Sequence, residues 1–266
     1  MTSADSLNKI FFDHKITLFG VASFLECKAI DCRNSSKIPH QAKSVICCAF
    51  PYLVKTSQPR NLCYYACVKD YHLVVGGILA EICQNLAKTF PHKFVPFVDN
   101  SPIDEVPAAV LAGIGVRGDN SLLITKEFGS YVFLGEIVTD MEIMPSIPSD
   151  GGCLHCSACK KACPTSCLDK KFVKADCLSD ISQKKGILSA AEEDLLRKNG
   201  LAWGCDACQT ACPMNFQAKE TQIAEFLLSA KHFITAADVP TEIPTAAYGW
   251  RGEKVIRRNL ELLEKK

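Results

Sequence analysis

The cysteines of this 266-residue chain are concentrated in one short segment. The sequence contains 16 cysteines, and nine of them lie between residues 153 and 212. Seven of these nine form two regularly spaced runs, Cys153-x2-Cys156-x2-Cys159-x3-Cys163-Pro164 and Cys205-x2-Cys208-x3-Cys212-Pro213. Two-residue spacers let successive thiolates turn inward onto one compact metal centre. This segment therefore predicts a metal-binding or redox unit.

The first run has the spacing by which bacterial-type ferredoxins hold iron–sulfur clusters, and the second run is a half-copy of it. In the second run, Ala202 stands where a further cysteine would fall. In two-cluster ferredoxins the cysteine before the proline ligates the other cluster. Crossing these cysteines predicts two 4Fe-4S clusters. The first set is Cys153, Cys156, Cys159 and Cys212, and the second contains Cys163, Cys205, Cys208 and one more cysteine.

The missing ligand of the second cluster is either Cys177 or Cys167. Cys167 lies one helical turn after Cys163 and is expected to point along the same local segment, whereas Cys177 is far enough away to return independently. We therefore favour Cys177. Two zinc sites are the alternative, but zinc gives no reason for a third thiolate at the same spacing or for two Cys-Pro endings. A disulfide mesh does not suit a reducing compartment.

The rest of the composition is that of an ordinary globular protein. Lys and Arg exceed Asp and Glu by 30 − 29 = 1, and 48% of the residues are hydrophobic. This excludes a disordered chain and a broadly polycationic nucleic-acid binder. The N-terminus lacks the features of a secretory signal, and no apolar run reaches the ~18 residues of a membrane span. We expect a soluble, cytoplasmic monomer without membrane contact.

Residues 15–144 mix strand and helix patterns, which predicts an α+β fold with a sheet core. The expected strands are Ile16–Ser23, Ser44–Phe50, Phe94–Val98, Ser121–Thr125 and Tyr131–Val138. The expected helices are Tyr71–Phe90, Pro107–Ala112, one from the capping box of Ser189 and Glu192 to Gly200, Gln222–Ser229 and Lys254–Glu264.

A stretch rich in Pro, Ser and Gly at residues 144–152 is predicted to be a linker. It divides the chain into a sheet-containing domain at 1–148 and a ferredoxin-like double 4Fe-4S domain at 149–218. A short helical C-terminal extension at 219–266 follows.

Several stretches of the sequence resemble the epoxyqueuosine reductase family, which are cobalamin-dependent iron–sulfur enzymes. They are Lys69-Asp70-Tyr71-His72, Phe97-Val98-Asp99-Asn100-Ser101-Pro102, Ala112-Gly113-Ile114-Gly115-Val116-Arg117-Gly118-Asp119-Asn120, Phe133-Leu134-Gly135-Glu136, and Gly204-Cys205-Asp206-Ala207-Cys208-Gln209 leading to Cys212-Pro213. The resemblance implies that residues 1–148 form a corrinoid-binding α/β domain. It also supports Cys177, since the family places a cysteine between the two runs.

By this resemblance, the clusters feed single electrons to a base-off cobalamin, whose low-valent cobalt removes the epoxide oxygen of epoxyqueuosine at the tRNA wobble position. The family's acid maps onto Asp99. Independently, a carboxyl at the end of an apolar strand is expected to be desolvated and protonated near neutral pH, although Asp99 could also only cap the turn before Pro102. The implied cofactor contacts are Asp70, His72, Asn120, Ser121 and Ser179. An external donor of the ferredoxin or flavodoxin type would supply the electrons.

The chain departs from the family pattern at two places. The family's Gly-Lys-Asn turn is Gly118-Asp119-Asn120 here, so a role of that lysine does not carry over. The family's helical repeat region, which helps to hold tRNA, is mostly missing, and we interpret the chain as a short member. Phosphate contacts would depend on the basic stretch of Arg257, Arg258, Lys265 and Lys266.

Two other functions are compatible with the sequence. One is a related corrinoid and iron–sulfur reductase with a small-molecule substrate. The other is a two-cluster electron-transfer protein that binds no corrinoid.

Overall fold

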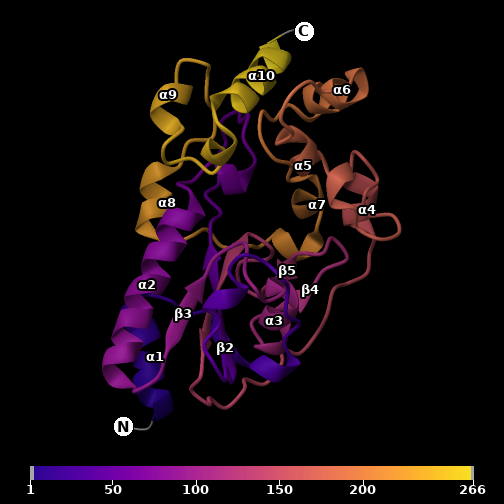
Figure 1. Cartoon of the computed structure of the whole chain (residues 1–266). Helices are drawn as coiled ribbons and strands as arrows, with labels where there is room; N and C mark the ends of the chain where they lie inside the picture. The colour runs from indigo at the N-terminus through magenta and orange to yellow at the C-terminus, as the bar shows by residue number, and fades with distance from the viewer. Residues whose placement is uncertain (1–2, 265–266) are drawn as a thin grey trace.

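A four-stranded antiparallel sheet forms the centre of the first half of the chain in the computed structural model, which describes residues 3–264 (Figure 1). Its strands, in spatial order, are β1 (Phe19–Ser23), β2 (Ser44–Pro51), β6 (Val132–Thr139) and β3 (Phe94–Phe97). The register places Glu136 of β6 between Cys47 of β2 and Phe97 of β3. Because Glu136 is only 1% exposed, a carboxyl group is buried in the middle of the sheet.

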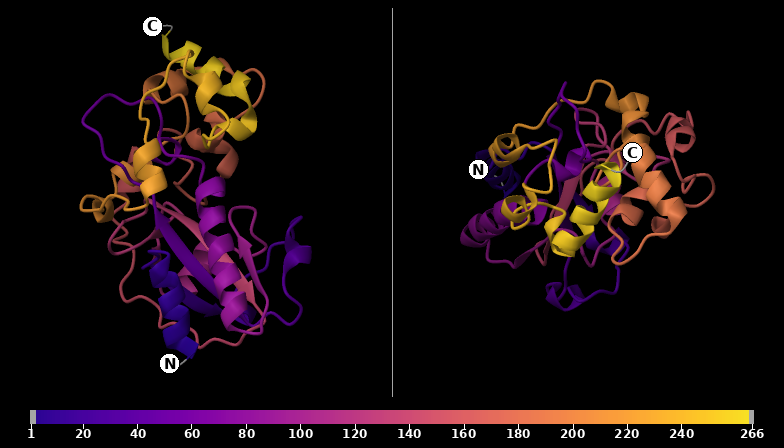
Figure 2. Two further views of the ribbon diagram at one scale, coloured as in Figure 1. Left: turned by 90° about the vertical axis from the view of Figure 1, so that its left-hand side faces the viewer. Right: turned by 90° about the horizontal axis from the view of Figure 1, so that it is seen from above.

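Helices cover both faces of this sheet, and β2 is therefore buried on both sides. The covering helices are α1 (Ser3–Asp13), α2 (Tyr71–Thr89) and α3 (Glu105–Leu111). Successive side chains of a strand point to opposite faces. Ile46 and Phe50 belong to the core that α1 and α2 complete, whereas Val45 and Ala49 belong to the core beneath α3. Figure 2 shows α1 and α2 side by side on one side of the sheet.

The predicted strands and helices of this half are confirmed, with shifted ends. The first strand begins at Phe19 and not at Ile16, whose backbone N–H bonds back to Phe11 at the end of α1. The predicted strand 121–125 shortens to β5 (Leu123–Ile124), which pairs with β4 (Val116–Arg117). These two short strands close the glycine-containing turn that leads to Asn120.

The cysteine-rich half is built from short helices, α4 (Ala158–Ala162), α5 (Leu178–Ser182), α6 (Ala190–Asn199) and α7 (Ala207–Thr210). Helices α4 and α7, which contain Cys159 and Cys208, lie against each other. The predicted capping box of Ser189 and Glu192 is confirmed, and Gly200 ends α6 in the left-handed conformation. No helix within residues 3–264 is both long and apolar enough to cross a membrane.

Residues 219–264 fold back onto the first half of the chain. Their helices are α8 (Ala224–Ser229), α9 (Val239–Glu242) and α10 (Glu253–Glu264). The buried rings of Trp203 and Tyr248 lie in one core together with Leu62 and Cys63. This core draws residues from all three parts into which the sequence was divided. The division itself stays a prediction.

The basic stretch near the C-terminus is engaged in contacts within the protein. Arg257 forms an ion pair with a glutamate of α10. Arg258 donates hydrogen bonds to two backbone carbonyl oxygens that precede α6. Lys265 and Lys266 lie outside the described residues. The two arginines therefore stabilise the fold, and phosphate binding cannot be assigned to them from sequence alone.

Two glycines allow a direct test of packing in front of the second cysteine run. Gly200 and Gly204 have nearly equal φ angles of 72° and 74°. A Cβ on Gly204 would lie 2.0 Å from Cys63 Sγ, whereas a Cβ on Gly200 would meet nothing within 4 Å. Gly200→Ala is therefore expected to cost only the ~1–2 kcal/mol of a left-handed L-residue. Gly204→Ala carries the same backbone cost and adds about 1–3 kcal/mol, because the new methyl group would overpack the site beside Cys63.

Thermal unfolding of the two anaerobically purified variants measures this difference. We expect a clearly lower Tm for Gly204→Ala than for Gly200→Ala. Equal shifts in Tm would show that the contact between Gly204 and Cys63 is not tight.

Candidate metal centres and active site

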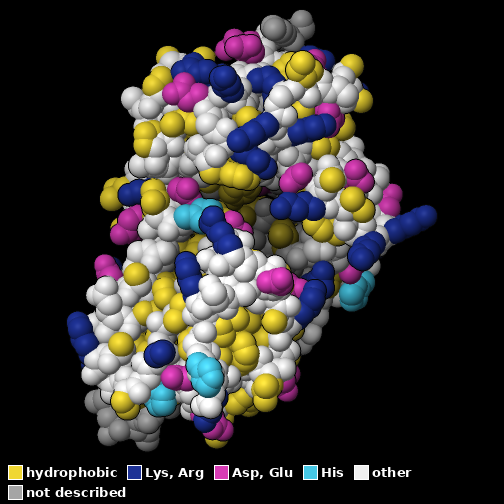
Figure 3. All heavy atoms as spheres, in the orientation of Figure 1, with side chains coloured by type: hydrophobic (Ala, Val, Ile, Leu, Met, Phe, Trp, Pro, Cys, Tyr) yellow, Lys and Arg dark blue, Asp and Glu magenta, His cyan; other side chains and the backbone are white. Residues whose placement is uncertain are grey.

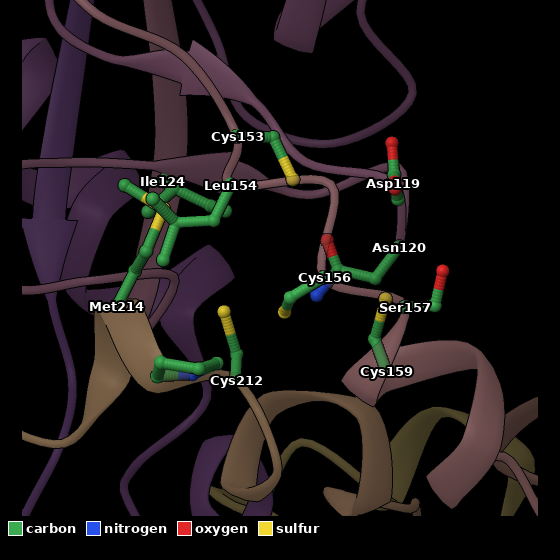
Figure 4. A pocket seen from close by; sticks show the side chains of 11 residues that line it. Asp119, Asn120, Ile124, Cys153, Leu154, Cys156, Ser157, Cys159, Cys212 and Met214 are labelled. Carbon is green, nitrogen blue, oxygen red and sulfur yellow. The ribbon is translucent and has the colours of Figure 1, made fainter.

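Four cysteines surround one pocket between the sheet domain and the cysteine-rich half (Figure 4). They are Cys153, Cys156, Cys159 and Cys212, the members of the first predicted ligand set. The four sulfur atoms border the same hollow. Four thiolates around one space suit a 4Fe-4S cluster. The structure thus brings Cys212, which is distant in sequence, to the first run.

The local backbone explains how the first run wraps around this pocket. His155 and Ser157, one in each two-residue spacer, have left-handed φ angles of 49° and 60°. Such residues are uncommon outside glycine, and they bend the chain sharply. The bends let Cys153, Cys156 and Cys159 face the same point instead of alternating along an extended chain.

The second predicted ligand set also comes together. Burial raises the pKa of Cys205 to about 11 and that of Cys208 to about 12, and the nearby sulfurs of Cys163 and Cys177 add to both shifts. Such thiols lose their protons when a metal supplies the compensating charge. Cys167, the alternative to Cys177, lies in the same group with its Sγ 3.5 Å from Cys163 Sγ.

A buried ion pair anchors the second run to the first half of the chain. Asp206, between Cys205 and Cys208, is only 2% exposed. Its carboxylate accepts hydrogen bonds from the Arg60 guanidinium and from the Tyr64 backbone N–H. The attraction to Arg60 offsets the desolvation that raises the pKa of Asp206. The second cluster site is therefore tied to the loop before α2.

Asp99 lies in an exposed turn just after β3 and is paired with a histidine. Its Oδ2 lies 3.3 Å from His72 Nε2, while His72 Nδ1 lies 2.8 Å from Asp70 Oδ1. Asp70 also caps α2 by accepting the His72 backbone N–H. Hydrogen bonds to Asp70 and Asp99 raise the pKa of His72 to about 9. A weaker attraction to Lys174 of the cysteine-rich half lowers the pKa of Asp99 further.

The expected protonation of Asp99 is therefore wrong for this structure. The sequence pattern predicts a desolvated, protonated carboxyl at this position. Its side chain is 57% exposed, and the hydrogen bond to His72 holds its pKa below the usual value. The strand ends at Phe97, two residues too early to bury Asp99. In the free protein, the proton of this pair is on His72.

Two further carboxyl groups, the half-buried Glu105 and the buried Glu136, were not predicted as site residues. Burial, together with the nearby Asp99, raises the pKa of Glu105 to about 7. Burial, together with Glu105, raises the pKa of Glu136 well above its usual value. Glu136 is hydrogen-bonded to Ser101 in the Asp99 turn, and its other oxygen has no partner among the described residues. The sequence signal for such a group was Glu136, a charged residue inside the predicted strand 131–138.

The other predicted contacts lie in separate places. Asn120 is 6% exposed and lines the first cluster pocket, and its Nδ2 has no partner among residues 3–264. Ser121 follows in the left-handed conformation. Ser179 on α5 is hydrogen-bonded to the Tyr65 hydroxyl. Asp119 pairs with His155 at 2.9 Å, beside Cys153.

The surface between the two halves is hollowed. In the orientation of Figure 1, Figure 3 shows a hollow between the sheet domain and the parts above it, with several Lys and Arg side chains around it. Figure 1 shows the ribbons of α5 and α7 bordering this region. A cofactor or a polyanionic ligand would meet both domains there.

The sequence matches two known families. Residues 33–100 match the family described as Epoxyqueuosine reductase QueG, DUF1730, and residues 152–215 match the 4Fe-4S double cluster binding domain. The curated epoxyqueuosine reductase of Gloeobacter violaceus is 33% identical over 205 residues, 73% of this chain and 64% of that relative.

Solved structures agree with these matches. The structure of epoxyqueuosine reductase from Streptococcus thermophilus has a TM-score of 0.82 and 26% identity, covering 99% of this chain and 81% of that one. An epoxyqueuosine reductase with an epoxyqueuosine-modified tRNA-Tyr stem loop has a TM-score of 0.79 at 24% identity, covering 98% and 80%. The second match, at this identity, concerns the fold alone.

The fold and the cysteines define an iron–sulfur protein in which a double 4Fe-4S domain follows an antiparallel-sheet domain. The chain belongs to the epoxyqueuosine reductase family. It spans less than two thirds of the length of the curated relative described above.

Proposed function

We propose that this protein reduces epoxyqueuosine to queuosine in tRNA with electrons from two 4Fe-4S clusters and with cobalamin as cofactor. The observation that most supports this function is the pair of Asp99 and His72, in which a carboxylate is hydrogen-bonded to a histidine with a raised pKa. The family membership and the relative solved with a modified tRNA stem loop support the choice of substrate.

The proposed ligand sets are the two crossed groups of cysteines. The first cluster is held by Cys153, Cys156, Cys159 and Cys212, which share one pocket. The second is held by Cys163, Cys177, Cys205 and Cys208, whose sulfurs interact electrostatically. A protein of the ferredoxin or flavodoxin type would reduce these clusters.

The predicted contact residues carry polar groups that suit a corrinoid, whose rim carries many amides. The buried Nδ2 of Asn120 is an unpartnered donor beside the first cluster pocket. Asp70, His72, Ser121 and Ser179 would supply further polar contacts. When bound, cobalamin would supply the low-valent cobalt through which cluster electrons reach the epoxide.

The carboxyl groups and the histidine would supply the protons. Removing an epoxide oxygen as water, with a carbon–carbon double bond left behind, consumes two electrons and two protons. His72, charged below a pH of about 9, would pass its proton to Asp99, and Asp99 would deliver that proton to the departing oxygen. Glu105 and Glu136, both with raised pKa values, lie behind the turn as a second proton source.

A pH profile tests the role of His72. Because its raised pKa of about 9 keeps it protonated at neutral pH, kcat is expected to stay level from pH 7 and to fall as the pH rises through about 9. His72→Asn should lower kcat and remove the fall of kcat at high pH. His92→Asn, at an exposed histidine paired with Asp140, should keep it. If kcat of His72→Asn still falls through a pH of about 9, His72 is not the titrating group.

Titration of the anaerobic protein with cob(II)alamin tests cofactor binding. Electron paramagnetic resonance should show a changed cobalt signal that saturates at one cobalamin per chain. An unchanged cobalt signal in a protein that contains both clusters would favour an electron-transfer protein without corrinoid.

A further inference from the structure

One cysteine of the cysteine-rich segment is not used by the proposed clusters. Of the nine cysteines between residues 153 and 212, eight are proposed ligands, and Cys167 is left over. It is not a remote, inert side chain. Cys167 is 7% exposed, and its Sγ lies 3.5 Å from Cys163 Sγ. Among the described residues, these two sulfurs form the one sulfur–sulfur hydrogen bond.

The backbone is bent so that these two sulfurs meet. The chain turns tightly after Cys163, where the Ser166 backbone N–H bonds to the Cys163 carbonyl oxygen at 3.2 Å. Ser166 has a left-handed φ of 55°, which is costly for a residue other than glycine. The turn returns Cys167 to the side of Cys163. Burial of Cys167 beside Leu168 then holds the thiol there.

Two groups that can donate hydrogen bonds lie beside the sulfur of Cys163. Thr165 Oγ1 lies 3.6 Å from Cys163 Sγ, so a hydroxyl and a thiol flank the same atom. Cys177 and Cys208 of the second ligand set pack in the same group as Cys163 and Cys167. A sulfur displaced by 3.5 Å from a ligand position can reach the same iron after a side-chain rotation and a small backbone shift.

We propose that Cys167 is a second thiol for the coordination position of Cys163. When Cys163 ligates the second cluster, Cys167 donates a hydrogen bond to its sulfur. When Cys163 is lost, Cys167 replaces it as the ligand and the cluster is retained. No electron transfer is needed for the exchange, because one thiolate replaces another and the proton of Cys167 passes to solvent. The inference rests on the proposed ligand set.

Iron analysis of three variants tests the replacement. Two 4Fe-4S clusters give 2 × 4 = 8 irons per chain. Cys163→Ala is expected to keep about eight irons after anaerobic reconstitution, whereas Cys205→Ala and the double variant Cys163→Ala/Cys167→Ala should keep about four. Four irons in Cys163→Ala would overturn the proposal. Eight irons in Cys205→Ala would instead show that the ligand set is wrong, and the inference would fall with it.

The reduction potential of the second cluster tests the hydrogen bond. A donor to a ligand sulfur stabilises the extra negative charge of the reduced cluster and raises its potential. Cys167→Ala should therefore lower the potential of one cluster, and Cys167→Ser, which keeps a donor, should restore part of it. Cys83→Ala, at a buried cysteine of α2, is the matched control and should change neither potential. Equal cluster reduction potentials in Cys167→Ala and the unaltered protein would overturn the proposed hydrogen bond from Cys167 to Cys163.

Discussion

Asp99→Asn is expected to reduce turnover by about 10²–10⁴-fold while both clusters and cobalamin stay bound. The asparagine has the same shape and keeps an oxygen that can accept the hydrogen bond from His72, 3.3 Å away. It cannot transfer a proton to the departing oxygen. The loss should therefore appear in kcat, with little change in the binding of the modified stem loop.

The matched control for this variant is Asp104→Asn. Asp104 lies five residues later, pairs with Lys28 on the surface, and makes no capping hydrogen bond to α3. We expect its turnover to remain within a factor of about two, as for surface substitutions in general. If Asp99→Asn retains full turnover, Asp99 is not the acid.

Cys212→Ala is expected to remove the first cluster and leave the second. The iron content should fall by half, and turnover should be lost because the chain of electron carriers is broken. The reason is the shared pocket, in which Cys212 completes the set of Cys153, Cys156 and Cys159 although it belongs to the second run, four residues after Cys208.

Alkylation with iodoacetamide, followed by peptide mass spectrometry, shows which cluster is lost. In Cys212→Ala, the cysteines of the first run up to Cys159 should become reactive, while Cys163, Cys177, Cys205 and Cys208 stay protected. The opposite pattern, with Cys205 and Cys208 reactive, would mean that each run holds its own cluster and that the crossing is wrong.

The sequence predicted the cluster domain well because its pattern is local. The spacing of each cysteine run determines which thiolates can share a centre, and the match to the double-cluster family covers the same residues. Strand β2 was also predictable, since an uninterrupted apolar run bounded by turns suits a strand buried on both faces. Helix α1 was not predicted, although Leu7, Ile10 and Phe11 have the i, i+3, i+4 spacing of an amphipathic helix.

The protonation states of the active site could not be predicted in the same way. The charge of Asp99 depends on His72, which is 27 residues away, and on where β3 ends. The raised pKa of Glu136 depends on the pairing of β6 with β2 and β3, and that of Glu105 depends on burial beside Asp99. These are long-range contacts, and a local sequence pattern does not contain them.

The structure also changes the view of tRNA binding. Arg257 and Arg258 were the main candidates for phosphate contacts, but they pair with groups of the protein itself. Figure 3 shows other Lys and Arg side chains around the hollow between the two halves of the chain. A net charge of +1 is compatible with such a local patch.

Conversion of a tRNA anticodon stem loop that bears epoxyqueuosine tests the central proposal most directly. The protein is purified anaerobically, loaded with cobalamin and supplied with reductant, and the nucleoside is analysed by mass spectrometry. We predict queuosine, recognised by the loss of one oxygen atom, and no product with Asp99→Asn. Unchanged epoxyqueuosine, with both clusters reduced and cobalamin bound, would contradict the proposed function.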